Sequence, residues 1–236
     1  MKRNRSSRKV RDRQPAAPDT AAGWILPVTL GAAAVLLLIA YGPALHGPFV
    51  FDDLYLPFLE PSVGTPPLSA LFTSLRPLMM LSFWMNRTLF GPEPFSFHLV
   101  NVIVHFLSGI VVFVLVRRFL EIAGRADGML LPGFAAAVFL FHPVQTEAVA
   151  YVASRSEVLS VLFGYGVLAV LLRRDIHAPV TWPQAFSILL LLGLAVASKE
   201  HTAILPAALV LTHVWWRRPA GPHGDPPEQA ESWWSP

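Results

Sequence analysis

The sequence predicts an all-α protein, a polytopic membrane bundle of about six transmembrane helices with one further helix at the membrane surface. Apolar residues make up 54% of the chain and charged residues only 14%, whereas roughly a quarter of a typical soluble protein is charged. Residues 20–51 and 94–116 contain no Asp, Glu, Lys or Arg. Since about 20 apolar residues cross a bilayer, both stretches are long enough to span one.

Arg-Arg pairs give the orientation of the bundle, because Lys and Arg concentrate on the cytoplasmic side of membrane proteins. The pairs close three apolar stretches, at 117–118, 173–174 and 217–218. A cytoplasmic N-terminus places all but four of the 18 basic residues on the inside, and the inverted orientation reverses that bias. We therefore expect both termini in the cytoplasm and spans at about 24–45, 97–116, 129–141, 158–172, 183–197 and 202–216.

The ends of the chain have a different composition from the middle. Residues 1–22 carry seven basic side chains and are expected to form a disordered cytoplasmic tail. The apolar run that follows is longer than the usual 7–15 residues of a signal peptide, which favours a retained anchor over a cleaved signal. Residues 23–217 form the predicted transmembrane domain, and the Pro- and Gly-rich residues 218–236 a second cytoplasmic tail.

The stretch 77–90 is apolar but short, and lies between Arg76 and Arg87. Such a segment more often lies in the interface than spans it, and a seventh span here would move the later Arg pairs outside. We expect an interfacial helix in the first external loop. Spans three to six are also short and continue into polar sequence, which indicates either a water-filled cavity at their outer ends or a thin bundle with ordinary loops.

Acidic residues open the first external loop. Adjacent carboxylates near a membrane raise each other's pKa, so Asp52 or Asp53 is a candidate general base. A cation site and simple solvated acids are the alternatives.

A second polar cluster follows His142. Residues 144–159 are expected to form one helix, and its periodicity places four polar residues on the same face: Glu147, Tyr151, Ser154 and Arg155. An arginine there can hold a phosphate, or it can pair with Glu147 and pin the helix. His142 and Glu147 lack the spacing and the third ligand of a zinc site, and we expect no metal.

The turn between spans five and six carries Lys199 and Glu200. A lysine on the outer side opposes the general charge bias, which indicates an anionic partner or a hairpin that holds its own ion pair. Span two carries a polar stripe of His98, Asn101, His105 and Ser108. Such a stripe joins helices in most membrane proteins, and lining a cavity is the other interpretation.

Composition also excludes some functions. Cysteine is absent, so there is no disulfide, thiolate nucleophile or Cys metal site. The basic residues lie in one tail and at span ends, which argues against nucleic-acid binding.

Several motifs, in order, resemble the membrane half of the transmembrane-and-tetratricopeptide-repeat O-mannosyltransferases, which are GT-C-type glycosyltransferases. The resemblance covers about residues 47–216. The motifs are Phe49-Val50-Phe51-Asp52-Asp53, Arg76-Pro77-Leu78, Phe97-His98-Leu99-Val100-Asn101, His142-Pro143-Val144-Gln145-Thr146-Glu147, Ser154-Arg155-Ser156-Glu157 and Ser198-Lys199-Glu200.

The resemblance implies transfer of a sugar, typically mannose, from a polyprenyl-phosphate carrier to a protein Ser/Thr hydroxyl on the non-cytoplasmic side. No cofactor is implied, since the lipid-linked sugar is the donor. The membrane would be the inner membrane of a bacterium or the endoplasmic reticulum of a eukaryote. Asp52 or Asp53 would be the catalytic base, and the residues expected to bind the donor phosphate or sugar are Arg76, His142, Glu147, Arg155, Lys199 and Glu200.

Members of this family continue into further spans and helical repeats, and this sequence contains no 34-residue repeat. We therefore expect either a fragment or a chain that needs a partner to supply the missing helices or repeats. A transporter or flippase for a lipid-linked or anionic substrate is the main alternative, and a non-catalytic scaffold is the third.

Overall fold

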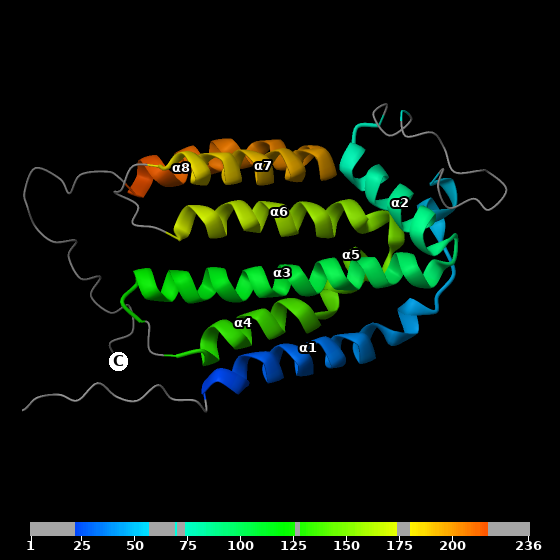
Figure 1. Ribbon diagram of the computed structural model, residues 1–236, viewed down its shortest axis with the longest axis horizontal. Coiled ribbons are helices and arrows are strands. Elements are labelled where there is room, and N and C mark those ends of the chain that lie inside the picture. The colour runs from blue at the N-terminus through cyan, green and yellow to red at the C-terminus, as the bar shows by residue number, and fades with distance from the viewer. Residues whose placement is uncertain (1–21, 57–68, 70–73, 126–127, 174–179, 217–236) are drawn as a thin grey trace, which may run out of the picture.

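The computed structural model describes residues 22–56, 69, 74–125, 128–173 and 180–216. Both predicted tails, 1–22 and 218–236, lie almost entirely outside these residues. The described part is helical, and its long helices run side by side along one axis, with α2 across one end (Figure 1). The all-α prediction is confirmed.

Every predicted span falls on a helix. The first two long helices are α1 (Ala22–Leu45) and α3 (Pro94–Ile122), and the interfacial segment forms α2 (Pro77–Phe90). The remaining spans are α4 (Leu130–Phe141), α6 (Arg155–Leu172), α7 (Trp182–Ser198) and α8 (Leu205–Trp216).

Three helical segments are long and apolar enough to cross a bilayer: Leu26–Leu45, Pro94–Ile122 and Val152–Leu172. Segments 130–141, 182–198 and 200–211 are apolar but shorter. Many large apolar side chains on these helices are exposed, including Leu36 and Ile39 of α1. Exposed apolar surface on this scale marks a surface that contacts lipid or protein. Length and composition together identify a membrane protein.

Local sequence explains where the helices begin and end. Proline occupies the first turn of α2, α3 and α7, where its missing N–H costs no helical hydrogen bond. Gly91 ends α2 with a positive φ of 79°, and its N–H donates to the Arg87 carbonyl, as expected of a glycine after a helix. His142 precedes Pro143 and is extended, which stops α4.

The prediction of one helix over 144–159 is wrong. The chain instead forms η3 (Pro143–Gln145), α5 (Thr146–Ala150) and η4 (Val152–Ser154) before α6 begins. Tyr151 is extended, with φ −85° and ψ 119°. The break is stabilised from outside the segment, because the Asn101 side-chain amide of α3 donates to the carbonyls of Val149 and Tyr151.

The polar stripe on α3 joins helices and does not line a cavity. His98, Asn101, His105 and Ser108 are all at most 4% exposed. A ring nitrogen of His105 lies 3.2 Å from the Leu140 carbonyl of α4, and its ring packs against Tyr41 of α1 and Phe139 of α4. His105 therefore fixes α1 and α4 against α3, Asn101 fixes the chain around Tyr151, and Ser108 bonds to Val104 of its own helix.

The two ends of the bundle differ. One end, called the outer end here, holds η1 (Phe51–Tyr55), the start of α2 and η5 (Glu200–Ile204) (Figure 1). The opposite end holds the start of α1 and the ends of α3, α6 and α8. The acidic and cationic residues singled out in the sequence gather at the outer end, and Arg117, Arg118 and Arg173 at the opposite end.

Close packing of α3 on α4 depends on Gly109. A Cβ atom at this position would lie 2.6 Å from Cδ2 and 2.7 Å from Cγ of Leu140, whereas a Cβ at Gly133 of α4 would meet nothing within 4 Å. Alanine favours a helix over glycine by about 1 kcal/mol at either position. At Gly109, overpacking by about 1–3 kcal/mol opposes that gain.

We predict that Gly109→Ala lowers the thermal unfolding temperature in detergent, while Gly133→Ala leaves it unchanged or raises it. The Leu140→Ala change should relieve part of the Gly109→Ala defect in the double variant. Equal unfolding temperatures for the two alanine variants would show that α3 and α4 are not packed this closely.

Candidate functional site

Residues 151–157, called the connector here, link the parts of the outer end. The hydroxyl of Tyr151 accepts a hydrogen bond from the Asp52 amide at 2.8 Å. The Ala153 amide donates to Asp53 Oδ1 at 2.6 Å, and Glu157 forms an ion pair with Lys199. The connector thus contacts η1 at its start and, at its end, Lys199, the residue between α7 and η5.

The two adjacent carboxylates have different surroundings. Asp53 is fully buried, and its oxygens accept from the amides of Val50 and Ala153. Burial raises the pKa of the Asp53 carboxyl, although these amide hydrogen bonds act in the opposite direction. Asp52 is exposed. Asp53 therefore ties η1 to the connector, and Asp52 is the carboxylate that a ligand can reach.

The backbone is strained at Phe51, the residue before the two aspartates. Its φ is +49°, and no other non-glycine residue among those described has a positive φ. Such strain persists only where surrounding contacts enforce it, and it concentrates at functional sites. Here the bonds of Asp52 and Asp53 to the connector supply those contacts.

A cavity of about 500 Å³ lies between the start of η1 and α5, and Phe51, the residue before Asp52, is part of its lining. Glu147 and Tyr151 provide its polar side chains, and Val50, Phe51, Thr146 and Ala150 the rest of its wall. Desolvation raises the pKa of the Tyr151 hydroxyl, and the charges of Asp52 and Asp53 add to this effect. The cavity therefore offers a carboxylate and a neutral phenol close to Asp52.

His142 lies outside this lining. Its Nδ1 accepts a hydrogen bond from the Val144 amide at 3.2 Å, so that it caps η3. Within the described residues no group of three or more His, Cys, Asp or Glu side chains could hold a metal ion.

Arg155 is fully buried. Its Nε donates to Asn101 Oδ1 at 2.8 Å, and its Nη2 to the Phe97 carbonyl at 2.8 Å and to Asn86 Oδ1 at 3.1 Å. The guanidinium carbon lies 4.3 Å from the centre of the Phe83 ring. Arg155 therefore fixes α6 against α2 and α3, and in this structure it does not reach a surface where a donor could bind.

The expected pairing of Glu147 with Arg155 is also absent from the described contacts. The extended Tyr151 separates the two residues into different helices, so they no longer share a helical face. Their separation follows from the same break that positions Tyr151 beside Asp52.

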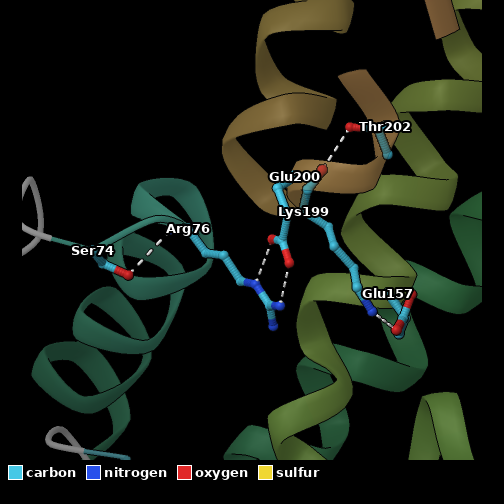
Figure 2. A network of polar contacts seen from close by, with 6 residues as sticks. All are labelled: Ser74, Arg76, Glu157, Lys199, Glu200 and Thr202. Carbon is cyan, nitrogen blue, oxygen red and sulfur yellow. Dashed lines mark hydrogen bonds and ion pairs between the residues drawn. The ribbon is translucent and has the colours of Figure 1, made fainter. Parts of the chain in front are cut away.

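A second charged group lies between α2 and η5 (Figure 2). Arg76 makes a bidentate ion pair with Glu200, with Nε–Oε2 at 2.9 Å and Nη2–Oε1 at 2.7 Å. Lys199 extends from the same turn to Glu157 at the start of α6 (Figure 2). Two cations and two carboxylates therefore neutralise each other at one place on the outer end.

The ion pair changes the titration of Glu200. Hydrogen bonds from Arg76 lower the pKa of this carboxyl from 4.5 to about 2. The folded-state pKa is depressed, so the contribution of the pair to stability is present above the ordinary glutamate pKa and is lost as the pH falls toward 2. At neutral pH both partners are charged.

Four residues outside the predicted site also hold this end together, and two of them were singled out in the sequence: Asn101 in the polar stripe, and Tyr151 on the predicted face with Glu147 and Arg155. Asn86 and Asn101 support Arg155, Tyr151 contacts Asp52, and Glu157 pairs with Lys199. No described hydrogen bond or ion pair joins Asp52 or Asp53 directly to Arg76 or Lys199. The connector is the link between the two groups.

We predict that Arg155→Lys destabilises the protein by on the order of 3 kcal/mol, since a lysine cannot reproduce the planar set of donors and leaves buried acceptors unpaired. Thermal unfolding in detergent measures this. Arg125→Lys, at an exposed position, is the control and should change little. The same unfolding temperature for both variants would contradict the supporting role of Arg155.

Comparison with known proteins gives sequence relatives of one kind. Protein O-mannosyl-transferase TMTC1 of Mus musculus is 38% identical over 155 residues, which are 57% of this chain and 16% of the relative. Protein O-mannosyl-transferase F38B6.6 of Caenorhabditis elegans is 29% identical over 194 residues, 75% of this chain and 26% of the relative. Protein O-mannosyl-transferase TMTC3 of Mus musculus is 30% identical over 181 residues, 68% of this chain and 19% of the relative.

No family model matches the chain, and no solved structure does. The chain covers between 16% and 26% of the length of the relatives named above. The similarity nevertheless extends over more than half of this chain in each of them. By sequence, the chain is therefore a relative of the transmembrane-and-tetratricopeptide-repeat protein O-mannosyltransferase family.

Proposed function

We propose that this chain is the membrane-embedded part of a glycosyltransferase that moves a sugar, mannose, from a polyprenyl-phosphate donor to a protein Ser or Thr hydroxyl. The observation that carries the proposal is the exposed Asp52, which follows Phe51 and contacts Tyr151, two residues that line a cavity of about 500 Å³. The curated relatives of the chain are named protein O-mannosyl-transferases. A partner chain, or further sequence of this protein, would supply the segments that the relatives have in addition.

Asp52 acts as the general base in this proposal. Its carboxylate takes the proton of the acceptor hydroxyl while the hydroxyl oxygen attacks the anomeric carbon of the sugar. The bond between that carbon and the phosphate oxygen breaks, and polyprenyl phosphate leaves with the bonding electrons. Asp52 is exposed and Asp53 is buried. This difference supports Asp52 as the base and Asp53 as the residue that positions it.

Arg76 and Lys199 neutralise the donor phosphate. Both cations are held at the outer end by carboxylates, so donor binding exchanges Glu200 and Glu157 for phosphate oxygens. Fixed cations at a leaving phosphate stabilise the charge that develops in the transition state. Glu147, in the cavity wall, binds sugar or acceptor hydroxyls, while His142 and Arg155 keep the surrounding backbone in place.

The proposed topology is multi-pass, with the outer end on the non-cytoplasmic side. The start of α1 and the end of α8 lie at the same end of the bundle (Figure 1), which supports termini on one side of the membrane. The Arg pairs assign that side to the cytoplasm. The membrane is the inner membrane of a bacterium or the endoplasmic reticulum of a eukaryote.

The first test is transfer of mannose from polyprenyl-phosphate-mannose to a Ser/Thr peptide by membranes that contain the chain. Asp52→Asn is expected to lower the rate by about 10²–10⁴-fold, the usual contribution of a general base. Glu93→Gln, which removes another exposed carboxylate next to α3, is the matched control and should keep the wild-type rate. Equal rates for the wild type and Asp52→Asn would exclude Asp52 as the base.

The second test concerns the donor phosphate. Arg76→Gln and Lys199→Gln are each expected to raise the KM for the lipid-linked donor about tenfold or more, because a charge-assisted hydrogen bond contributes about 1.5–3 kcal/mol. The KM for the peptide should stay the same. Arg125→Gln removes a cation at the opposite end and serves as the control. A change confined to the peptide KM would assign Arg76 and Lys199 to the acceptor.

A further inference from the structure

A basic cleft lies at the opposite end of the bundle, between the ends of α3 and α6. Its volume is about 260 Å³, many times the roughly 30 Å³ that a water molecule occupies in the liquid. The charged side chains in its lining are Arg117, Arg118, Glu121 and Arg173. None of these residues takes part in the proposed transfer reaction.

The cleft has more positive than negative charge. Glu121 is shared between Arg117 and Arg118, at 3.1 Å and 3.0 Å. Arg173 forms no hydrogen bond or ion pair with any residue that the structure describes. Among the described residues, the lining therefore holds three guanidinium groups and one carboxylate, and an anion in the cleft would offset the repulsion between the guanidinium groups.

Helix capping explains only one of these arginines. Arg118 Nε donates to the Leu172 carbonyl at the end of α6, which is a common way to satisfy a helix C-terminus. The Arg117 side chain is 55% exposed, and its one hydrogen-bond partner among the described residues is Glu121. Arg117 and Arg173 therefore remain available to a ligand.

The other wall of the cleft is apolar, formed by Phe113, Val114 and Ala169. These residues belong to the two helical segments Pro94–Ile122 and Val152–Leu172 that are long and apolar enough to cross a bilayer. The cleft thus combines cations at the helix ends with apolar surface that continues into the membrane. Basic pockets between transmembrane helices bind the head groups of anionic lipids in this way.

We propose that this cleft binds the phosphate-bearing head group of an anionic phospholipid. Arg117 and Arg173 contact the phosphate, Arg118 keeps α3 and α6 at the spacing that forms the cleft, and an acyl chain lies along Phe113 and Val114. The site is separate from the proposed transfer site, and the bound lipid joins the ends of α3 and α6.

The test uses the full chain in neutral detergent, with phosphatidylglycerol as the anionic probe and phosphatidylcholine as the zwitterionic one. Native mass spectrometry measures the lipid retained, and the unfolding temperature measures stabilisation by each lipid. We expect the wild type to retain phosphatidylglycerol and to be stabilised by it. Arg117→Gln and Arg173→Gln should each weaken its binding about fivefold to tenfold, the effect of one cation near a lipid phosphate.

Arg125→Gln removes one positive charge at the same end but outside this cleft, whose lining does not include Arg125. It should bind phosphatidylglycerol like the wild type, and Arg173→Lys should restore part of the binding lost in Arg173→Gln. An equal loss in Arg125→Gln, equal binding of phosphatidylcholine, or displacement of phosphatidylglycerol by millimolar inorganic phosphate would overturn the proposal. The last result would identify a free anion as the ligand.

Discussion

The arrangement of the outer end depends on the buried guanidinium of Arg155. Removing such a group from water costs several kcal/mol. Three neutral oxygens and the face of Phe83 offset part of this cost, while Nη1 is buried without a hydrogen-bond partner among the described residues. The acceptors come from α2 and α3, so one side chain fixes the start of α6 against both. Since Arg155 is part of the connector, the contacts of the connector with η1 and with Lys199 are fixed by the same interaction.

From this anchor the roles of the two adjacent aspartates follow. The Ala153 amide lies two residues before Arg155 and reaches Asp53, which draws η1 onto the bundle. The neighbouring Asp52 remains exposed, and its amide contacts Tyr151. Two residues of the same type thus acquire different chemistry from backbone placement alone, because one carboxylate is satisfied by amides and the other stays open to a ligand.

The sequence was sufficient to predict what depends on hydrophobic length and charge bias: the all-α class, the helix at each span, and α2. The break at Tyr151 could not be predicted, because it depends on the amide of Asn101, which is distant in the chain. Pairing of Glu157 with Lys199, and burial of Arg155, are likewise set by tertiary contacts. A charged residue at a helix start has the same local pattern whether it faces water or the interior.

The two ends of the bundle differ in how their positive charges are compensated. At the outer end the cations of Arg76 and Lys199 are neutralised by Glu200 and Glu157, so they remain compensated when no phosphate is present. In the proposed reaction the donor phosphate would replace both carboxylates, so its affinity would be limited to the difference between the two sets of contacts. At the opposite end Arg117 and Arg118 share the single carboxylate of Glu121, and Arg173 has no partner among the described residues. The positive charge at this end is therefore suited to an anionic lipid that stays bound, as we propose, whereas the phosphate at the outer end must leave after each transfer.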